Sequence, residues 1–219
     1  MRDQIKIYLQ ELMMNGELKF GERISLPVLA KKLNVSVTPV REALSQLQQV
    51  EIIEAIPNRG FFLPQPNIQK ISELYPIIAN LEYLGVSEST YTNEDIVILE
   101  TLFQIENTYD NAVDRIQSDI KFHQLLLKNY QNNALKTILY DLKLRVFLYE
   151  FYYMENTKLA QTSTNYHKNV IAAIKKKDVL KAAELIRESW LTSIPFIEKH
   201  FNSRNDAFEH TNTLAASNF

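Results

Sequence analysis

The stretch VSVTPVREAL, at residues 35–44, decides the fold of the N-terminal part of this chain. Ser36 and Thr38 are residue types that cap helix N-termini, and Pro39 suits the first helical position, where its missing N–H has no partner to lose. Beyond Pro39, apolar residues recur every three or four positions, while Arg41 lies on the opposite, polar side. The stretch therefore predicts an amphipathic helix with a polar outer face.

The flanking sequence completes a helix-turn-helix motif followed by a wing. Residues 26–33 form a short amphipathic segment upstream, which is the first helix of the motif. A tight turn separates it from the second helix, which begins near Pro39. Residues 52–56 are rich in β-branched side chains, residues 57–60 (PNRG) favour a turn, and residues 61–63 are apolar again. This order predicts a β-hairpin directly after the second helix, which is the arrangement of a winged-helix DNA-binding domain.

Candidate DNA contacts are the polar and basic residues at the start of the second helix, in the first helix and at the tip of the hairpin. They are Lys31, Lys32, Thr38, Arg41, Arg59 and Gly60. Basic side chains neutralise phosphates, and a glycine lets the backbone approach them closely. The net charge is only −2, and residues 1–66 hold eight Lys/Arg against seven Asp/Glu. The prediction of DNA binding thus depends on local placement of charge.

Composition is that of an ordinary globular protein, with 46% hydrophobic and 23% charged residues. The chain has no cysteine, which fits a reducing compartment. The N-terminus lacks the apolar stretch of a signal peptide, and no run is long enough to span a bilayer. We expect a cytoplasmic protein without a membrane partner.

The fold class predicted from these patterns is mainly α, with two domains and a tail. Residues 64–67 (PQPN) have the stiffness and polarity of a linker, so the winged helix is assigned to residues 1–66. An additional N-terminal helix is predicted near residues 2–14. Residues 67–202 are expected to form an all-α bundle, and residues 203–219 a flexible tail. The bundle helices are predicted near 68–90, 94–107, 109–130, 132–155, 160–176 and 178–200.

Four polar residues of the second domain have spacings that predict a shared site. Asp119 and His123 are four positions apart, so on a helix they share one face and can hold one divalent ion. His167 and Ser189 each lie eleven positions from Asp178, where two helices are expected to form a hairpin, so they can face each other. Two interpretations stay open: a metal site, or hydrogen-bonded polar groups that line a pocket.

The N-terminal motif resembles the winged-helix domain of GntR-family bacterial transcription regulators. The resemblance comes from residues 21–24 (GERI), 29–30 (LA), 35–36 (VS), 38–44 (TPVREAL), Leu47 and 59–60 (RG). It implies operator binding by the second helix and the wing. Pro27 and Val37 stand where the family usually has arginine, and Glu51 stands where a glycine usually ends the second helix.

The second domain resembles the FCD ligand-binding domain of the FadR-like branch of that family. The matching residues are Asp119-x3-His123, Tyr166-His167, 171–173 (IAA), Asp178 and 182–183 (AA). The resemblance implies a divalent, Zn-like metal held by one Asp and three His, with a small carboxylate bound nearby. Asp119, His123 and His167 match three ligands, and Ser189 replaces the third histidine.

Two residues of the predicted helix near 132–155 are further ligand-binding candidates, together with Ser189. Arg145 offers a guanidinium that can clamp a carboxylate, and Tyr149 offers an apolar wall with a polar tip. The resulting prediction is a homodimeric bacterial transcription regulator, not an enzyme, whose binding to a double-stranded DNA operator is modulated by a small organic acid.

The same residues are compatible with two alternative functions. One is a metal-dependent hydrolase or lyase that uses Asp119, His123 and His167, although no obvious general base lies beside them. The other is a winged helix used for protein–protein contact, without an effector. Phosphate contacts lose affinity steeply as salt is added, whereas an apolar protein interface does not, so salt dependence separates these functions.

Overall fold

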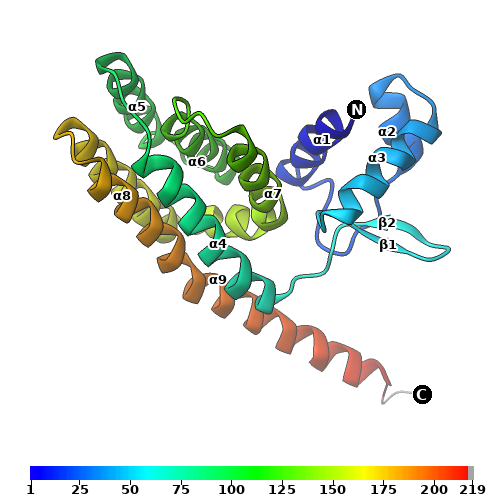
Figure 1. The fold of residues 1–219 in the computed structure, drawn as a ribbon. Coiled ribbons are helices and arrows are strands. Elements are labelled where there is room, and N and C mark those ends of the chain that lie inside the picture. The colour runs from blue at the N-terminus through cyan, green and yellow to red at the C-terminus, as the bar shows by residue number, and fades with distance from the viewer. Residues whose placement is uncertain (217–219) are drawn as a thin grey trace. The chain divides into compact units, whose positions relative to one another are not determined.

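The computed structural model describes the backbone of residues 1–216 and the side chains of residues 1–202. Within this part, the chain forms nine helices and one two-stranded sheet (Figure 1). The elements are α1 Arg2–Met14, α2 Leu26–Leu33, α3 Val37–Gln49, β1 Glu54–Ile56, β2 Gly60–Phe62, α4 Ile68–Ser87, α5 Asn93–Glu106, α6 Ala112–Leu126, α7 Asn133–Glu155, α8 Thr157–Lys175 and α9 Val179–Ala216. The predicted mainly α fold, a winged helix followed by a helical domain, is confirmed.

The chain divides into two compact units, and helix α7 contributes to both. The first unit combines Met1–Pro66 with Lys136–Phe151, the middle of α7. The second unit combines Asn67–Leu135 with the described residues from Tyr152 onward. Residues 203–219 are predicted to be flexible, but their side chains lie outside the described residues, and residues 217–219 also lie outside the described backbone. The flexibility of this segment therefore stays a prediction.

Helices α1, α2 and α3 enclose the core of the winged helix. The buried side chains recur at helical spacing, as the apolar pattern predicts. They are Ile5, Leu9 and Met13 of α1, Leu26, Leu29 and Ala30 of α2, and Val40, Ala43, Leu44 and Leu47 of α3. The same spacing leaves the opposite side of α3 exposed.

Both ends of α3 differ from what the sequence suggests. The helix begins at Val37 after the N-cap residue Ser36, whose side chain makes no capping hydrogen bond, so Pro39 occupies the third helical position and not the first. Its missing N–H still costs nothing, because the first four N–H groups of a helix have no partner within the helix. Beyond the other end, Glu51 adopts a left-handed backbone with φ of +56°, the conformation for which a glycine is usual.

The wing is an antiparallel hairpin with a tight turn. Its register pairs Glu54 with Phe62 and Ile56 with Gly60. The Arg59 N–H donates to the Ile56 carbonyl at 3.0 Å, and Asn58 has a φ of +62°, so the intervening Pro57-Asn58 turn has the pattern of type II. Gly60 has a φ of +104°, which a side chain would strain.

The second unit is a helical bundle in which α4 and α9 lie side by side and α8 packs against α9 (Figure 1). Helix α4 approaches the end of α6 so closely that a Cβ added to Gly85 would lie 2.5 Å from Leu127 Cδ2. A larger residue at position 85 would therefore require the Leu127 side chain to move. Helix α5 packs against α6 and α8, which places α4, α5, α6 and α8 around a common interior. No helix among the described residues is long and apolar enough to span a membrane.

Candidate metal centre and DNA-binding face

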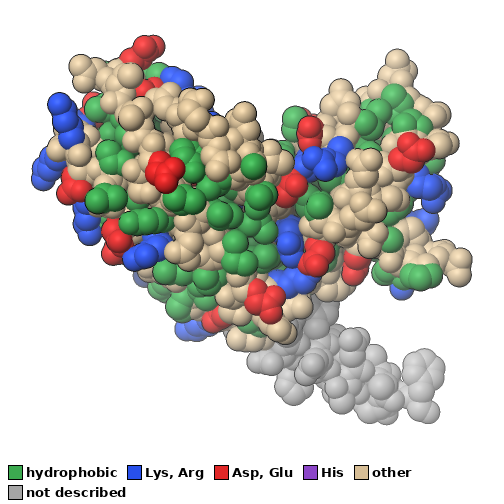
Figure 2. Space-filling view, viewed as in Figure 1, with side chains coloured by type: hydrophobic (Ala, Val, Ile, Leu, Met, Phe, Trp, Pro, Cys, Tyr) green, Lys and Arg blue, Asp and Glu red, His purple; other side chains and the backbone are tan. Residues whose placement is uncertain are grey.

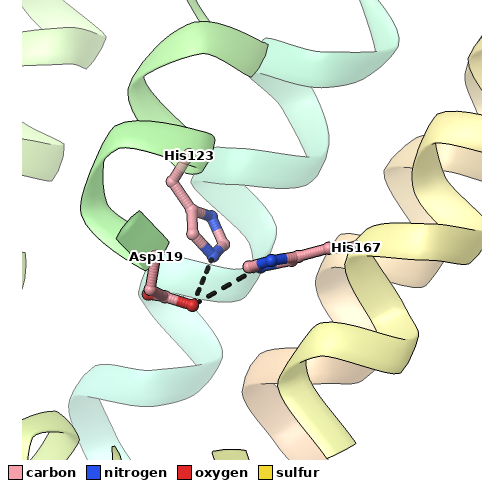
Figure 3. Close-up of side chains that lie close together, drawn as sticks. All are labelled: Asp119, His123 and His167. Atoms are coloured by element: carbon pink, nitrogen blue, oxygen red, sulfur yellow. Dashed lines mark ion pairs between the residues drawn. The ribbon is translucent and has the colours of Figure 1, made fainter. Parts of the chain in front are cut away.

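Asp119 and His123 of α6 and His167 of α8 converge inside the second unit (Figure 3). Asp119 Oδ1 lies 3.8 Å from His123 Nε2 and 3.4 Å from His167 Nε2. All three residues are buried, and one ligand atom from each lies within 4.8 Å of the other two. The structure thus brings together the three residues that the sequence predicts as metal ligands.

Each histidine is held from behind by a buried glutamate. His123 Nδ1 donates to Glu82 Oε2 at 2.6 Å, and His167 Nδ1 donates to Glu106 Oε2 at 2.9 Å. Because a carboxylate accepts this hydrogen bond, the proton resides on Nδ1 and the Nε2 atom faces Asp119. Carboxylates that orient histidines in this way are typical outer partners of metal ligands.

Sequence reasoning missed Glu82 and Glu106, although a signal for them exists. Glu82 lies four residues after Ile78 and four before Val86, on the buried stripe of α4, and Glu106 lies four residues after the buried Leu102 of α5. Glu82 is only 1% exposed, and Glu106 7%. A carboxylate within an apolar stripe indicates a buried hydrogen-bonding partner, because burying an unpaired charge is costly.

Further donors and an aromatic ring surround this cluster. Ser163 Oγ donates to Asp119 Oδ1 at 3.1 Å, and Thr164 Oγ1 donates to Glu106 Oε1 at 3.2 Å. The Phe122 ring stacks on the His167 ring, with their centroids 3.8 Å apart. The polar groups are therefore paired inside a largely apolar interior.

Together with the two glutamates behind the histidines, the cluster contains more carboxylates than imidazoles, and this excess favours the binding of positive charge. Asp119, Glu82 and Glu106 supply three carboxylates, whereas His123 and His167 supply two imidazoles. Burial lowers the pKa of His167, but hydrogen bonds to Asp119 and Glu106 more than offset this effect and raise the pKa to about 9. Without a metal, a proton on His167 supplies part of the positive charge that these carboxylates require.

The donor set fits a Zn-like ion. One carboxylate and two imidazole nitrogens are suitable ligands, and tetrahedral bonds of 2.0–2.2 Å separate ligand atoms by roughly 3.3–3.6 Å. The separations of 3.4 and 3.8 Å at Asp119 Oδ1 are close to this range. Ser189 Oγ donates to the Ile186 carbonyl of the same helix at 2.7 Å.

The structure brings neither Arg145 nor Tyr149 together with the Asp119 cluster. Both residues lie in the segment of α7 that groups with the N-terminal unit. Arg145 Nη2 donates to Glu51 Oε2 at 2.6 Å, and the Tyr149 ring lies 4.9 Å from the Phe20 ring. Their place in the fold was unpredictable from the sequence, because it depends on which unit this part of α7 packs against.

The predicted DNA contacts lie on the surface of the first unit. Lys31, Lys32, Thr38, Arg41 and Arg59 are exposed, and Gly60 is half-buried at the start of β2. Lys32 Nζ lies 5.1 Å from the centroid of the Tyr8 ring, and Arg59 Cζ lies 5.4 Å from that of Phe62, so aromatic rings support both cations. Acidic and basic side chains are interspersed across the face of the molecule in Figure 2, in agreement with the nearly balanced charge.

Two family models match the chain in sequence order. Residues 1–63 match the bacterial regulatory proteins of the gntR family, and residues 73–191 match the FCD domain. The second match covers more than half of the chain and includes the Asp119 cluster. These matches fit the winged helix of the first unit and the helical bundle of the second.

Known proteins resemble the chain over most of its length. The HTH-type transcriptional regulator YdhC of Bacillus subtilis is 29% identical over 176 residues, covering 78% of this chain and 79% of YdhC. The HTH-type transcriptional repressor GlaR of Escherichia coli is 24% identical over 211 residues, covering 88% and 93%. The solved structure of E. coli McbR/YncC has the same fold, with a TM-score of 0.76, 24% identity and coverage of 91% and 98%.

Proposed function

The chain belongs to the FCD-domain family and carries a gntR-family helix-turn-helix, and we propose that this transcriptional regulator senses a small carboxylate through a divalent metal. Asp119, His123 and His167 would hold the ion. One observation carries the proposal: two Nε2 atoms and one carboxylate oxygen converge, while both Nδ1 atoms are bound by buried glutamates. This arrangement presents the lone pairs of both imidazoles to a common point.

An incomplete ligand set supports the role in sensing. Four protein ligands close a metal site, whereas three leave a position for water or an incoming ligand. Ser189, which replaces the histidine expected from the family resemblance, bonds to its own helix and leaves such a position. A bound ion would supply a Lewis-acidic centre there, and a carboxylate is the small anion that suits it.

We further propose that the regulator binds its operator as a homodimer, with an effector-dependent fit. Thr38 and Arg41 would contact base edges, and Arg59 and Gly60 of the wing would contact the DNA backbone, with Lys31 and Lys32 supplying phosphate contacts. Two winged helices related by two-fold symmetry would read two half-sites. An effector that binds one arrangement of the dimer better shifts its population and thereby its affinity for DNA.

Metal content tests the first part of this proposal. Protein purified without an affinity tag or chelator should contain about one divalent ion per chain by elemental analysis, and the stripped protein should take up Zn²⁺ in calorimetry. His167→Ala should abolish this binding, because it removes a ligand. His200→Ala is the matched control, since His200 stacks on Tyr152 and does not belong to the cluster of Asp119, His123 and His167. A wild-type protein that binds no Zn²⁺ would rule out the site.

Carboxylate dependence tests the second part. Succinate should raise the melting temperature of Zn-loaded protein and leave that of His167→Ala unchanged, whereas succinamide, which lacks the charge, should have no effect. Selection from random duplexes then defines an operator for measuring DNA affinity with and without Zn²⁺ and succinate. A panel of small carboxylates with equal effects on the metal-free and Zn-loaded protein would contradict a role of the metal in sensing.

A further inference from the structure

We propose, on the premise of the metal site above, that Trp190 is a positioning residue. Its indole N–H fixes the Glu82 carboxylate, and Glu82 in turn orients His123 toward the ion. Helix α9 supplies no His, Cys, Asp or Glu ligand to the cluster among the described side chains. It would act on the site through Trp190, the residue that directly follows Ser189. The chain has a single tryptophan, which makes this role directly observable.

The hydrogen bonds at Glu82 carry the argument. Its Oε2 atom accepts two N–H groups, from His123 Nδ1 at 2.6 Å and from Trp190 Nε1 at 2.6 Å. Glu82 is 1% exposed, so water does not provide an easy replacement for either donor. Hydrogen bonds to a buried carboxylate are strong and geometrically selective. Two donors from different helices therefore fix the position of this oxygen.

Aromatic packing holds the indole in place. The Trp190 ring lies 5.5 Å from the Tyr75 ring in an edge arrangement and 5.7 Å from the tilted His123 ring. Trp190 itself is 6% exposed. Helices α4, α6 and α9 thus meet at one carboxylate oxygen: Glu82 and Tyr75 lie on α4, His123 on α6 and Trp190 on α9. Because α4 follows the wing after a short link, this contact joins the metal site to the helix next to the DNA-binding domain in the chain.

The second histidine has a weaker counterpart of this arrangement. Thr164 donates to the other oxygen of the Glu106 carboxylate at 3.2 Å, and it also lies 3.1 Å from the Ala160 carbonyl of its own helix. Its hydroxyl is therefore shared between two acceptors. Thr164 and His167 both lie on α8, so this contact adds only α5 to the arrangement. Removing the Thr164 hydroxyl should consequently affect metal binding less than removing the indole N–H.

Calorimetric titration with Zn²⁺ of the full chain tests the proposal. Trp190→Phe keeps an aromatic ring and removes the N–H, and it should weaken Zn²⁺ binding about 10- to 100-fold, the range seen for outer partners of metal ligands. Thr164→Val should weaken it less. Ile186→Val removes one methyl group from a buried site one turn earlier on α9 and should leave the affinity within about twofold. Wild-type affinity in Trp190→Phe would overturn the role of Trp190.

A measurement without a substitution at Trp190 keeps the test decisive if that variant folds poorly. The single indole N–H gives one signal in a ¹H–¹⁵N spectrum, and Zn²⁺ should shift this signal in the wild type but not in His167→Ala. A signal that stays unchanged while Zn²⁺ binds overturns the coupling and leaves the metal site standing. A wild type that binds no Zn²⁺ overturns the metal site and the role of Trp190 together.

Discussion

Each compact unit contains a network of buried charged side chains, and the Lys6 network of the first unit differs in charge balance from the Asp119 network of the second. In the first unit, Lys6 is 1% exposed and pairs with Asp141 of α7, with Asp3 3.6 Å away. In the second unit, three carboxylates meet two imidazoles. Because Asp3 is 77% exposed, the buried part of the first network joins one ammonium to one carboxylate, whereas the second network retains an excess of buried carboxylates.

This difference separates a structural role from a binding role. A paired charge holds two helices together and gains nothing from an added ion, because each partner already compensates the other. A cluster with excess carboxylate gains from a bound cation, whether a proton or a metal. We therefore expect Lys6 and Asp141 to stabilise the fold, and the Asp119 cluster to respond to pH and to metal.

The largest expected effect comes from breaking the balanced network. Asp141→Ala leaves the buried Lys6 ammonium without its main partner and should lower the free energy of unfolding by about 3–5 kcal/mol, measured in urea. Lys6→Met is the matched control: it removes the buried charge itself, keeps the volume, and should cost far less because Asp141 is partly exposed. Equal losses in the two variants would contradict this assignment.

The pH dependence of the metal-free protein tests the unbalanced network. The pKa of His167 is raised from 6.5 to about 9, so its contribution is fully present below about pH 6.5 and is lost as the pH rises through about 9. The free energy of unfolding should fall by about 3 kcal/mol over this interval, and His167→Gln should lack that change. A profile identical in wild type and His167→Gln would argue against this protonated histidine.

Added Zn²⁺ should stabilise the Asp119 network specifically, which further distinguishes it from the Lys6 network. At a free concentration of about 100 times its Kd, Zn²⁺ should stabilise the wild type by about 2.7 kcal/mol and Asp119→Ala by much less. Because the ion displaces the proton from His167, Zn²⁺ should bind more tightly as the pH rises toward 9. Thermal unfolding with and without EDTA measures both effects, and equal stabilisation of the two proteins would place the bound ion elsewhere.

The smallest effect on stability is expected at the exposed face that we propose to bind DNA. Arg41→Ala should change the free energy of unfolding by less than about 0.5 kcal/mol, since its side chain is exposed. The same substitution should weaken operator binding by about 1–3 kcal/mol if Arg41 reads a base. Arg59→Ala should instead weaken binding to all duplexes and lower the salt dependence by about one phosphate contact. Titrations at several salt concentrations distinguish these outcomes.

Features encoded by neighbouring residues were predictable. The pattern from Val35 to Leu44 predicted helix α3, and the PNRG turn predicted the wing. Both were predictable because caps, helical periodicity and turn chemistry act over a few positions. Helix α3 begins two residues before the start that Pro39 indicates, because Ser36, and not Thr38, is its N-cap residue. Asp119 and His123 could be paired for the same local reason, as they share one face of α6.

The sequence by itself determined the helices, the wing and the residue types of the candidate site. Only the tertiary structure decided that Glu82 and Glu106 support the histidines, that Trp190 bonds to Glu82, and that Lys6 pairs with Asp141. The partners in these contacts are 41, 61, 108 and 135 residues apart. Helical periodicity shows that a charged side chain faces inward, but the packing of helices selects its partner, because an inward face meets whichever helix covers it.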